Sequence, residues 1–201
     1  NYLPIIDFRP YAIGKNIPQQ TQGIPDEVKY FYKLKDKKTG EIKEFDKWPN
    51  GWDSIYDYVD SRTEVVKKGV DAPVKDFSIT DANGEDQTQT IINNPEPNFL
   101  LICYDLSKTN KKVFDKINDF AALCKQNNKA FTILTASTPD EIAKFKQATN
   151  CNLDFYNSDG TVLKTMIRSN PGLMMLKAGT VIQKWHYHSF PTFSEIQKNI
   201  N

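Results

Sequence analysis

The chain has 201 residues, of which 39% are apolar and 25% are charged, enough for one large domain or for a domain with an appendage. Its formal net charge of +1 excludes the strong electric field with which a protein attracts nucleic acid or an anionic membrane surface. No segment approaches the roughly 20 apolar residues of a membrane-spanning helix, and no signal peptide is recognisable. Because the chain starts at Asn1 and not at Met, we expect a processed or excised part of a longer protein.

The first 71 residues predict an extended arm followed by a β-rich extension. Residues 1–25 hold four prolines between apolar side chains, which favours an arm laid against other structure. Residues 28–35 alternate and 41–45 return, which indicates a hairpin with a charged face. The two tryptophans of 47–53 are expected to pin a turn to the body of the protein. The segment 54–68 fits a helix or a strand, and its β-branched residues favour extended structure at its end.

A second short hairpin is expected before the main sheet, with strands over 74–79 and 86–92. The turn between them contains Asp81, Asn83 and Glu85, which resemble the start of a calcium-binding loop. No glutamate stands at the closing position of such a loop, so we expect a turn at Gly84 and no metal.

The central part of the chain alternates between strands and helices. We expect a buried strand over 99–106, a helix over 111–127, a strand over 130–136, a helix from Thr138, an edge strand over 154–156 and a helix over 161–168. Strand, helix, strand and helix in this order predict parallel crossovers on one sheet. Thr138, with Pro139 after it and Glu141 three residues on, predicts a capping box.

A proline begins the last part of the predicted sheet. Pro171 fixes its own φ and pushes Asn170 towards an extended conformation, so a strand can begin here but cannot run through. Beyond it we expect a hairpin with strands over 172–176 and 181–185, and a final helix over 193–200 with Thr192 at its N-cap.

This order of elements resembles the thioredoxin-like fold, and the leading hairpin is similar to the membrane-associated thiol reductase and peroxiredoxin branch of that superfamily. Over nearly the whole chain, the sequence resembles the extracytoplasmic tail of bacterial DoxX-like membrane proteins, of the DoxX/MauE type. The segments that carry this resemblance are 7–11 (DFRPY), 13–14 (IG), 76–79 (DFSI) and 163–172 (LKTMIRSNPG).

The resemblance implies an α/β, thioredoxin-like domain over 72–201, with a central mixed sheet flanked by helices, after an arm and a β-rich extension over 1–71. It also implies a cis peptide bond before Pro171. A bundle of transmembrane helices would precede this chain, which would place the protein in the inner membrane with this domain facing the periplasm. The implied partners are that transmembrane domain, absent from this chain, and an unidentified periplasmic protein, with neither nucleic acid nor a small-molecule substrate.

The sequence departs from redox-active relatives directly after the first central strand. Such relatives carry Cys-x-x-Cys where the strand meets a helix N-terminus, because the helix dipole stabilises a thiolate there. Here the slot holds Ser107-Lys108-Thr109-Asn110, so no thiolate can form in it. A serine or threonine nucleophile would need a neighbouring base, and we instead expect Ser107 or Thr109 to cap the following helix.

Three cysteines, at positions 103, 124 and 151, are too few for a disulfide scaffold. Cys103 lies in an apolar strand and Cys124 on the apolar side of a helix, which predicts buried small hydrophobic residues. The alternative is a Cys124–Cys151 bridge in an oxidising compartment, whose geometry sequence alone cannot supply.

His186 and His188 are the only histidines, and two-residue spacing places them on one face of the expected strand. Two ligands make no zinc site without a nearby carboxylate or thiolate, so we expect exposed strand positions. Arg168 could bind a carboxylate or a quinone-like group, but a salt bridge within the domain is the favoured expectation.

The sequence therefore predicts a redox-inactive binding module with no cofactor and no metal. Its expected recognition surface consists of Ser107, Lys108, Thr109, Asn110, Arg168, Asn170 and Pro171. The alternative is an enzyme, an oxidoreductase or electron-transfer module that acts through a single cysteine with the membrane domain. That alternative requires at least one exposed cysteine with a lowered pKa.

Overall fold

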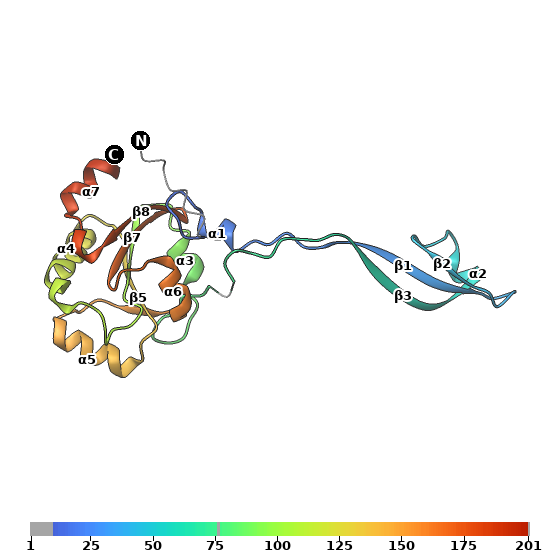
Figure 1. Cartoon of the computed structure of the whole chain (residues 1–201), viewed down its shortest axis with the longest axis horizontal. Helices are drawn as coiled ribbons and strands as arrows, with labels where there is room; N and C mark the ends of the chain where they lie inside the picture. Colours follow the sequence, from blue (N-terminus) through green and yellow to red (C-terminus); the bar gives the residue numbers. More distant parts are fainter. Residues whose placement is uncertain (1–9, 76, 201) are drawn as a thin grey trace. The chain divides into compact units, whose positions relative to one another are not determined.

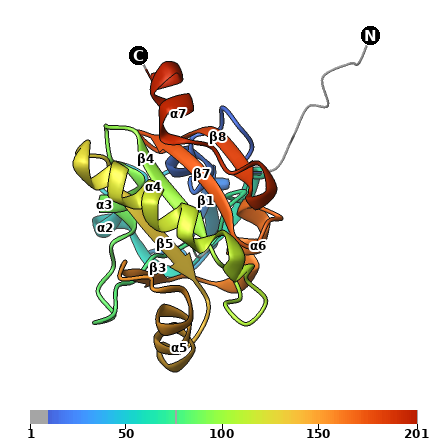
Figure 2. The ribbon, with the colours of Figure 1, turned by 90° about the vertical axis from the view of Figure 1, so that its left-hand side faces the viewer.

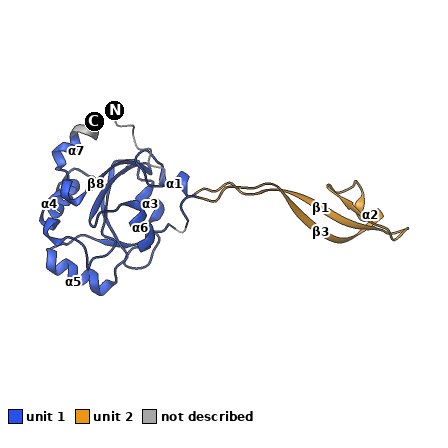
Figure 3. Ribbon diagram, in the orientation of Figure 1, with its two compact units in different colours: residues 1–21, 73–201 blue, residues 22–72 orange. Residues whose placement is uncertain are grey.

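A computed structural model describes residues 10–75 and 77–200 of the chain (Figure 1). The chain divides into two compact units, one formed by the described residues up to Thr21 and from Pro73 on, the other by residues 22–72 (Figure 3). This division differs from the sequence-based one, which grouped all of 1–71 together. The reason is that Tyr11 and Ile17 are buried in the apolar core of the first unit.

The first unit contains a five-stranded sheet and short helices. Its elements are α1 (Ile17–Gln20), α3 (Thr88–Ile92), β4 (Asn98–Ile102), the 3₁₀ turn η1 (Lys111–Val113), α4 (Phe114–Gln126), β5 (Phe131–Thr135), α5 (Pro139–Thr149), β6 (Phe155–Asn157), α6 (Gly160–Met166), β7 (Gly172–Lys177), β8 (Thr180–His186), the 3₁₀ turn η2 (Tyr187–Ser189) and α7 (Phe193–Ile200).

The sheet has the strand order β6-β5-β4-β7-β8. β4, β5 and β6 are parallel, as the strand–helix alternation predicted, whereas β7 runs antiparallel to both β4 and β8. β4 lies at the centre and each of its residues is buried. Alternate side chains enter two apolar clusters: Phe99 and Leu101 belong to one, which includes residues of α4, and Leu100 and Ile102 to the other, which includes residues of α6. Figure 2 shows α4 lying across one face of the sheet.

Several local predictions are confirmed. Thr138 and Glu141 form the capping box of α5, and Thr192 caps α7 in the same way, with its hydroxyl 3.4 Å from the backbone nitrogen of Glu195. The Asn170–Pro171 peptide bond is cis. The turn before α3 is built on Asp81, whose carboxylate accepts hydrogen bonds from two backbone N–H groups of the turn.

The second short hairpin was predicted wrongly. Residues 86–92 form only a single bridge, between Thr80 and Asp86, and then the helix α3. The hydroxyl of Thr88 accepts a hydrogen bond from the backbone of Ile79, and the carboxylate of Asp86 accepts one from the backbone of Thr88. These bonds turn the chain into a helix that buries Ile92 in the apolar core.

The second unit is a three-stranded antiparallel sheet of order β2-β1-β3. Its elements are β1 (Glu27–Asp36), β2 (Ile42–Phe45), α2 (Trp52–Ile55) and β3 (Tyr56–Lys67). The predicted hairpin is therefore confirmed, and the segment that fitted helix or strand is extended almost throughout. Trp48 packs on Tyr32 and Trp52, with ring centroids 4.3 and 4.4 Å apart, so the tryptophans hold their turn against this small sheet.

The two units should be separable by excision. The chain leaves and re-enters the first unit at nearly one point, because the backbone N–H of Val74 donates to the carbonyl of Gln20 over 3.0 Å. We expect a chain with residues 22–72 replaced by a short Gly-Ser linker to unfold cooperatively, within about 4 °C of the corresponding transition of the intact chain. Calorimetry checks this, and loss of the cooperative transition would show that the first unit depends on the insert.

Candidate functional site

The pairing of β4 with β7 brings the predicted site residues together. β4 ends at Ile102, directly opposite Gly172 at the start of β7, because the two strands are antiparallel. The segment 105–110 that follows β4 and the segment 168–171 that precedes β7 therefore meet at one edge of the sheet.

Hydrogen bonds lock these two segments to each other. The side-chain amide of Asn170 donates to the carbonyl of Asp105 over 2.8 Å, and the carbonyl of Asn170 accepts from the backbone N–H of Asn110 over 3.2 Å. The hydroxyl of Thr109, which is buried, lies 2.8 Å from the Asp105 carbonyl and 3.0 Å from Oδ1 of Asn170. Groups from both segments thus satisfy one another without a covalent cross-link.

Asp105 organises the exposed rim of the site. Its carboxylate accepts hydrogen bonds from the backbone N–H and hydroxyl of Ser107 and forms an ion pair with Lys108 at 2.8 Å. The hydrogen bond from Lys108 and that from Ser107 lower the pKa of Asp105 from 3.8 to about 2. Sequence reasoning missed this residue, although an aspartate shortly after a buried strand is a common start of an Asx turn, in which its carboxylate accepts from the backbone N–H two residues on.

The N-cap prediction for this segment was wrong. Asn110, and neither Ser107 nor Thr109, caps the helical segment, because its Oδ1 accepts a hydrogen bond from the backbone N–H of Lys112 over 3.0 Å. The hydroxyl of Ser107 is taken by Asp105, and that of Thr109 faces Asn170.

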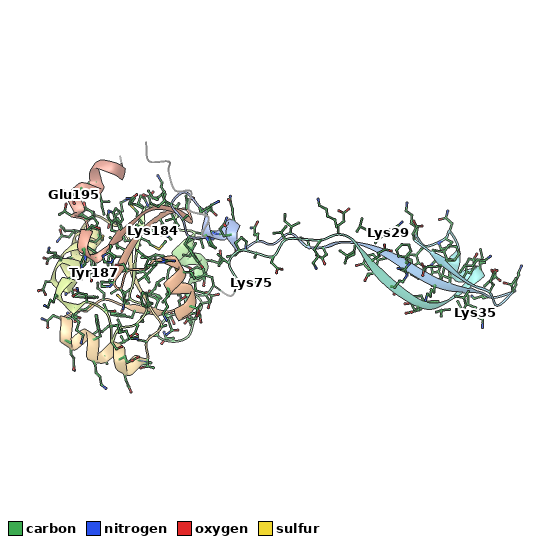
Figure 4. All side chains as sticks on the ribbon, viewed as in Figure 1. Lys29, Lys35, Lys75, Lys184, Tyr187 and Glu195 are labelled. Carbon is green, nitrogen blue, oxygen red and sulfur yellow. The ribbon has the colours of Figure 1, made fainter. Side chains whose placement is uncertain are left out.

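The turn at the cis proline is tied to the end of β8. The buried Ser169 hydroxyl donates to the carbonyl of Pro171 and accepts from the backbone N–H of Tyr187, a residue labelled in Figure 4. Arg168 beside it is exposed, and within residues 10–75 and 77–200 it forms no hydrogen bond or ion pair. The salt bridge that we expected for it is therefore not formed with any described residue.

The seven predicted site residues thus divide by exposure. Ser107, Lys108 and Arg168 present polar groups to solvent, whereas Thr109 and Pro171 are buried and Asn110 and Asn170 are half-buried. The exposed three can contact another molecule directly, and the other four hold the shape of the surface.

The two histidines lie close to each other but not on one strand. His186 is the last residue of β8, and His188 lies in η2, because the strand ends before it. Their ring centroids are 4.8 Å apart. In the described part of the chain, no three potential metal-binding side chains gather around a common point.

The three cysteines are free and fully buried, which confirms the prediction that they are buried small hydrophobic residues. The alternative Cys124–Cys151 bridge is absent from the structure. Burial raises the pKa of all three thiols, in the case of Cys124 to about 12. None of them offers the exposed, low-pKa thiol on which single-cysteine chemistry depends.

Solved structures of other proteins are similar to part of this chain. A thiol-disulfide oxidoreductase from Bacteroides fragilis has a TM-score of 0.49 and 9% identity over 62% of this chain and 96% of its own. StoA from Bacillus subtilis has a TM-score of 0.45 and 17% identity over 61% of this chain and 93% of its own. No protein-family model matches the sequence, and the search of curated proteins found no match.

The first unit has a thioredoxin-like fold. Its five-stranded mixed sheet, helices on both faces and cis-proline turn next to the end of the central strand meet the expectation drawn from the sequence. In the part of the chain that the structure describes, no helix has both the length and the apolar character needed to cross a membrane.

The depressed pKa of Asp105 makes its contribution to stability depend on pH. The unfolded chain takes up the proton near pH 3.8 and the folded chain near 2, so this carboxylate stabilises the fold above about pH 4, and the effect is lost as the pH falls towards 2. We expect Asp105→Asn to be less stable than the native chain at neutral pH and the difference to shrink at about pH 2. Urea unfolding at both pH values measures it, and a difference that does not change with pH would contradict the assignment.

Proposed function

We propose that this chain is a redox-inactive, thioredoxin-like binding module, the periplasmic part of a DoxX-like inner-membrane protein. One observation carries the first half of the proposal. The position that holds Cys-x-x-Cys in redox-active relatives is filled by Ser107-Lys108-Thr109-Asn110, and the last two of these residues are hydrogen-bonded to Asn170 of the cis-proline turn. The membrane context and the periplasmic location are supported by the sequence resemblance alone.

The geometry of the site favours recognition over chemistry. A thiol site must open and close a disulfide, whereas here polar side chains hold the two segments in one arrangement. A preorganised surface loses little conformational entropy when it binds. Ser107, Lys108 and the exposed guanidinium of Arg168, which forms no ion pair with a described residue, can then recognise a partner protein, most readily through a carboxylate, with which arginine forms paired hydrogen bonds.

The alternative function is single-cysteine oxidoreductase chemistry, and the structure does not support its requirement for a reactive thiol. An exposed cysteine with a lowered pKa would be needed, and Cys103, Cys124 and Cys151 are buried with raised pKa values. For Cys124 the shift from 9 to about 12 lowers the thiolate population at neutral pH by about a thousandfold.

The proposal that the chain is redox-inactive predicts no disulfide reductase activity in the native chain. It also predicts that a matched variant with two added cysteines gains this activity. Ser107→Cys combined with Asn110→Cys places Cys-x-x-Cys directly before η1 and α4, with the second cysteine at the N-cap of η1, where N–H groups favour a thiolate. We expect the native chain to reduce insulin disulfides no faster than free thiol does, and the double variant to exceed it. Turnover by the native chain, removed by changing one native cysteine to alanine, would instead establish the alternative.

The binding half of the proposal predicts a specific neighbour at the site in cells that make the full-length protein. A photo-cross-linking side chain at Ser107 should give one discrete protein adduct in the membrane fraction. Arg168→Glu should remove most of that adduct by reversing the recognising charge, whereas Lys144→Glu on the exposed side of α5 should leave it unchanged. An adduct that survives Arg168→Glu, or one found only in the cytoplasmic fraction, would contradict the proposal.

A further inference from the structure

The insert formed by residues 22–72 has two chemically different sheet faces. Residues paired directly across β1 and β3 share a face, and successive pairs alternate between the two faces. We call one the uncharged face, formed by Val28, Tyr30, Tyr32, Ser61, Thr63 and Val65, and the other the charged face, formed by Lys29, Phe31, Lys33, Asp60, Arg62 and Glu64.

On the charged face, Lys29, Arg62 and Glu64 form ion pairs within the insert. Arg62 lies 2.7 Å from Glu44 and stacks over the ring of Phe31 at 4.2 Å. Lys29, labelled in Figure 4, pairs with Asp46 at 2.9 Å. These contacts cover the aromatic ring and pair three of the charged side chains within one copy of the chain, so this face is less suited to an apolar partner.

The uncharged face is covered at only one end. Trp48 stacks on Tyr32 near the turn of the insert. Nearer the first unit, β2 no longer flanks β1, because its pairing spans only Tyr32 to Lys35. There the sheet is a two-stranded ribbon on which Tyr30 is 52% and Val65 50% exposed. A two-stranded ribbon with a bare apolar face is marginally stable in water, so covering this face would stabilise it.

The chemistry of the bare face favours a second copy of the chain as its occupant. It carries no charged side chain, and residues 22–72 hold ten basic and eleven acidic residues, so neither an anionic nor a cationic partner is favoured. Two copies of the insert would not repel each other. A second copy has the same twist, and it supplies both the aromatic ring of Tyr30 and the aliphatic side chains of Val28 and Val65 on which such a ring packs.

We propose that the uncharged faces of two copies of the insert pack against each other across a two-fold axis and make the protein a homodimer. Such an isologous contact is self-complementary, because each residue of one copy meets the same patch of the other. This interface is separate from the site around Pro171 and does not depend on the function proposed for that site.

Sedimentation of the full chain across the micromolar range tests the proposal. We expect a concentration-dependent species of twice the 23.1 kDa chain mass. Tyr30→Lys should weaken dimerisation by at least about tenfold, since it places a charge in the interface. Ile42→Lys is the matched control, because Ile42 is 55% exposed and pairs with Lys35 on the side of the charged face. Near-ultraviolet circular dichroism of the stacked Trp48 and Trp52 shows whether each variant keeps its fold.

A cross-linking experiment locates the interface independently. Because the three native thiols are buried, an added cysteine is the accessible one. A short bis-maleimide should join two copies of Thr63→Cys, on the uncharged face, and leave Glu64→Cys, on the charged face, largely monomeric. A monomer at every concentration, equal weakening by the two lysine variants, or equal cross-linking of the two cysteine variants would overturn the proposal.

Discussion

The antiparallel pairing of β7 with β4 is the constraint on which the thioredoxin-like unit depends. It reverses the direction of the chain at the centre of the sheet, and it places the cis-proline turn opposite the end of β4. Gly172 leaves room for the side chain of Ile167, which precedes the turn. A side chain at position 172 would have its first carbon 2.6 to 2.9 Å from three atoms of Ile167, a residue that is itself packed in the core, so a larger residue would force Ile167 or the turn to shift.

The same pairing of β4 with β7 determines which polar groups of the site bond to each other and which face solvent. It brings Asn170 within hydrogen-bond reach of Asp105, Thr109 and Asn110, and these four residues take up one another's polar groups. In a redox site, the corresponding position must leave a sulfur accessible to a second sulfur. Here the hydroxyl of Thr109 is buried between the two segments. The groups that face solvent are the hydroxyl of Ser107, the ammonium of Lys108 and the guanidinium of Arg168, which can form hydrogen bonds and ion pairs. The arrangement is therefore suited to holding a fixed surface towards another molecule.

Much of this fold could be predicted from the sequence, because its signals are local. The capping box at Thr138, the buried run of β4 and the proline before β7 each act within a few residues. The misread parts depend on contacts that no local pattern shows. Helix α3 replaced a predicted strand because Thr88 bonds to Ile79 nine residues away.

The candidate site, too, has features that the sequence predicts and features that depend on contacts between distant residues. That its two segments meet could be predicted, since this follows from the strand order, whereas their use as a recognition surface stays a prediction. The roles of its residues could not, because Asn170 and Asp105 lie 65 positions apart in sequence and meet only through the β4–β7 register. The N-cap assignment failed for this reason. Ser107 and Thr109 were candidates by type, but their hydroxyl groups are used by Asp105 and Asn170, which left Asn110 as the cap.

The stability of the fold does not depend on a disulfide bond between its cysteines. A fold held by a disulfide would lose stability under reducing conditions, whereas this one packs Cys103, Cys124 and Cys151 as free thiols inside its apolar core. Their raised pKa values keep them protonated, and burial denies oxidants access to the sulfur. Burial of the three thiols thus shields the fold from changes in the redox state of its surroundings. For these three free thiols, packing in the apolar core alone supplies this protection.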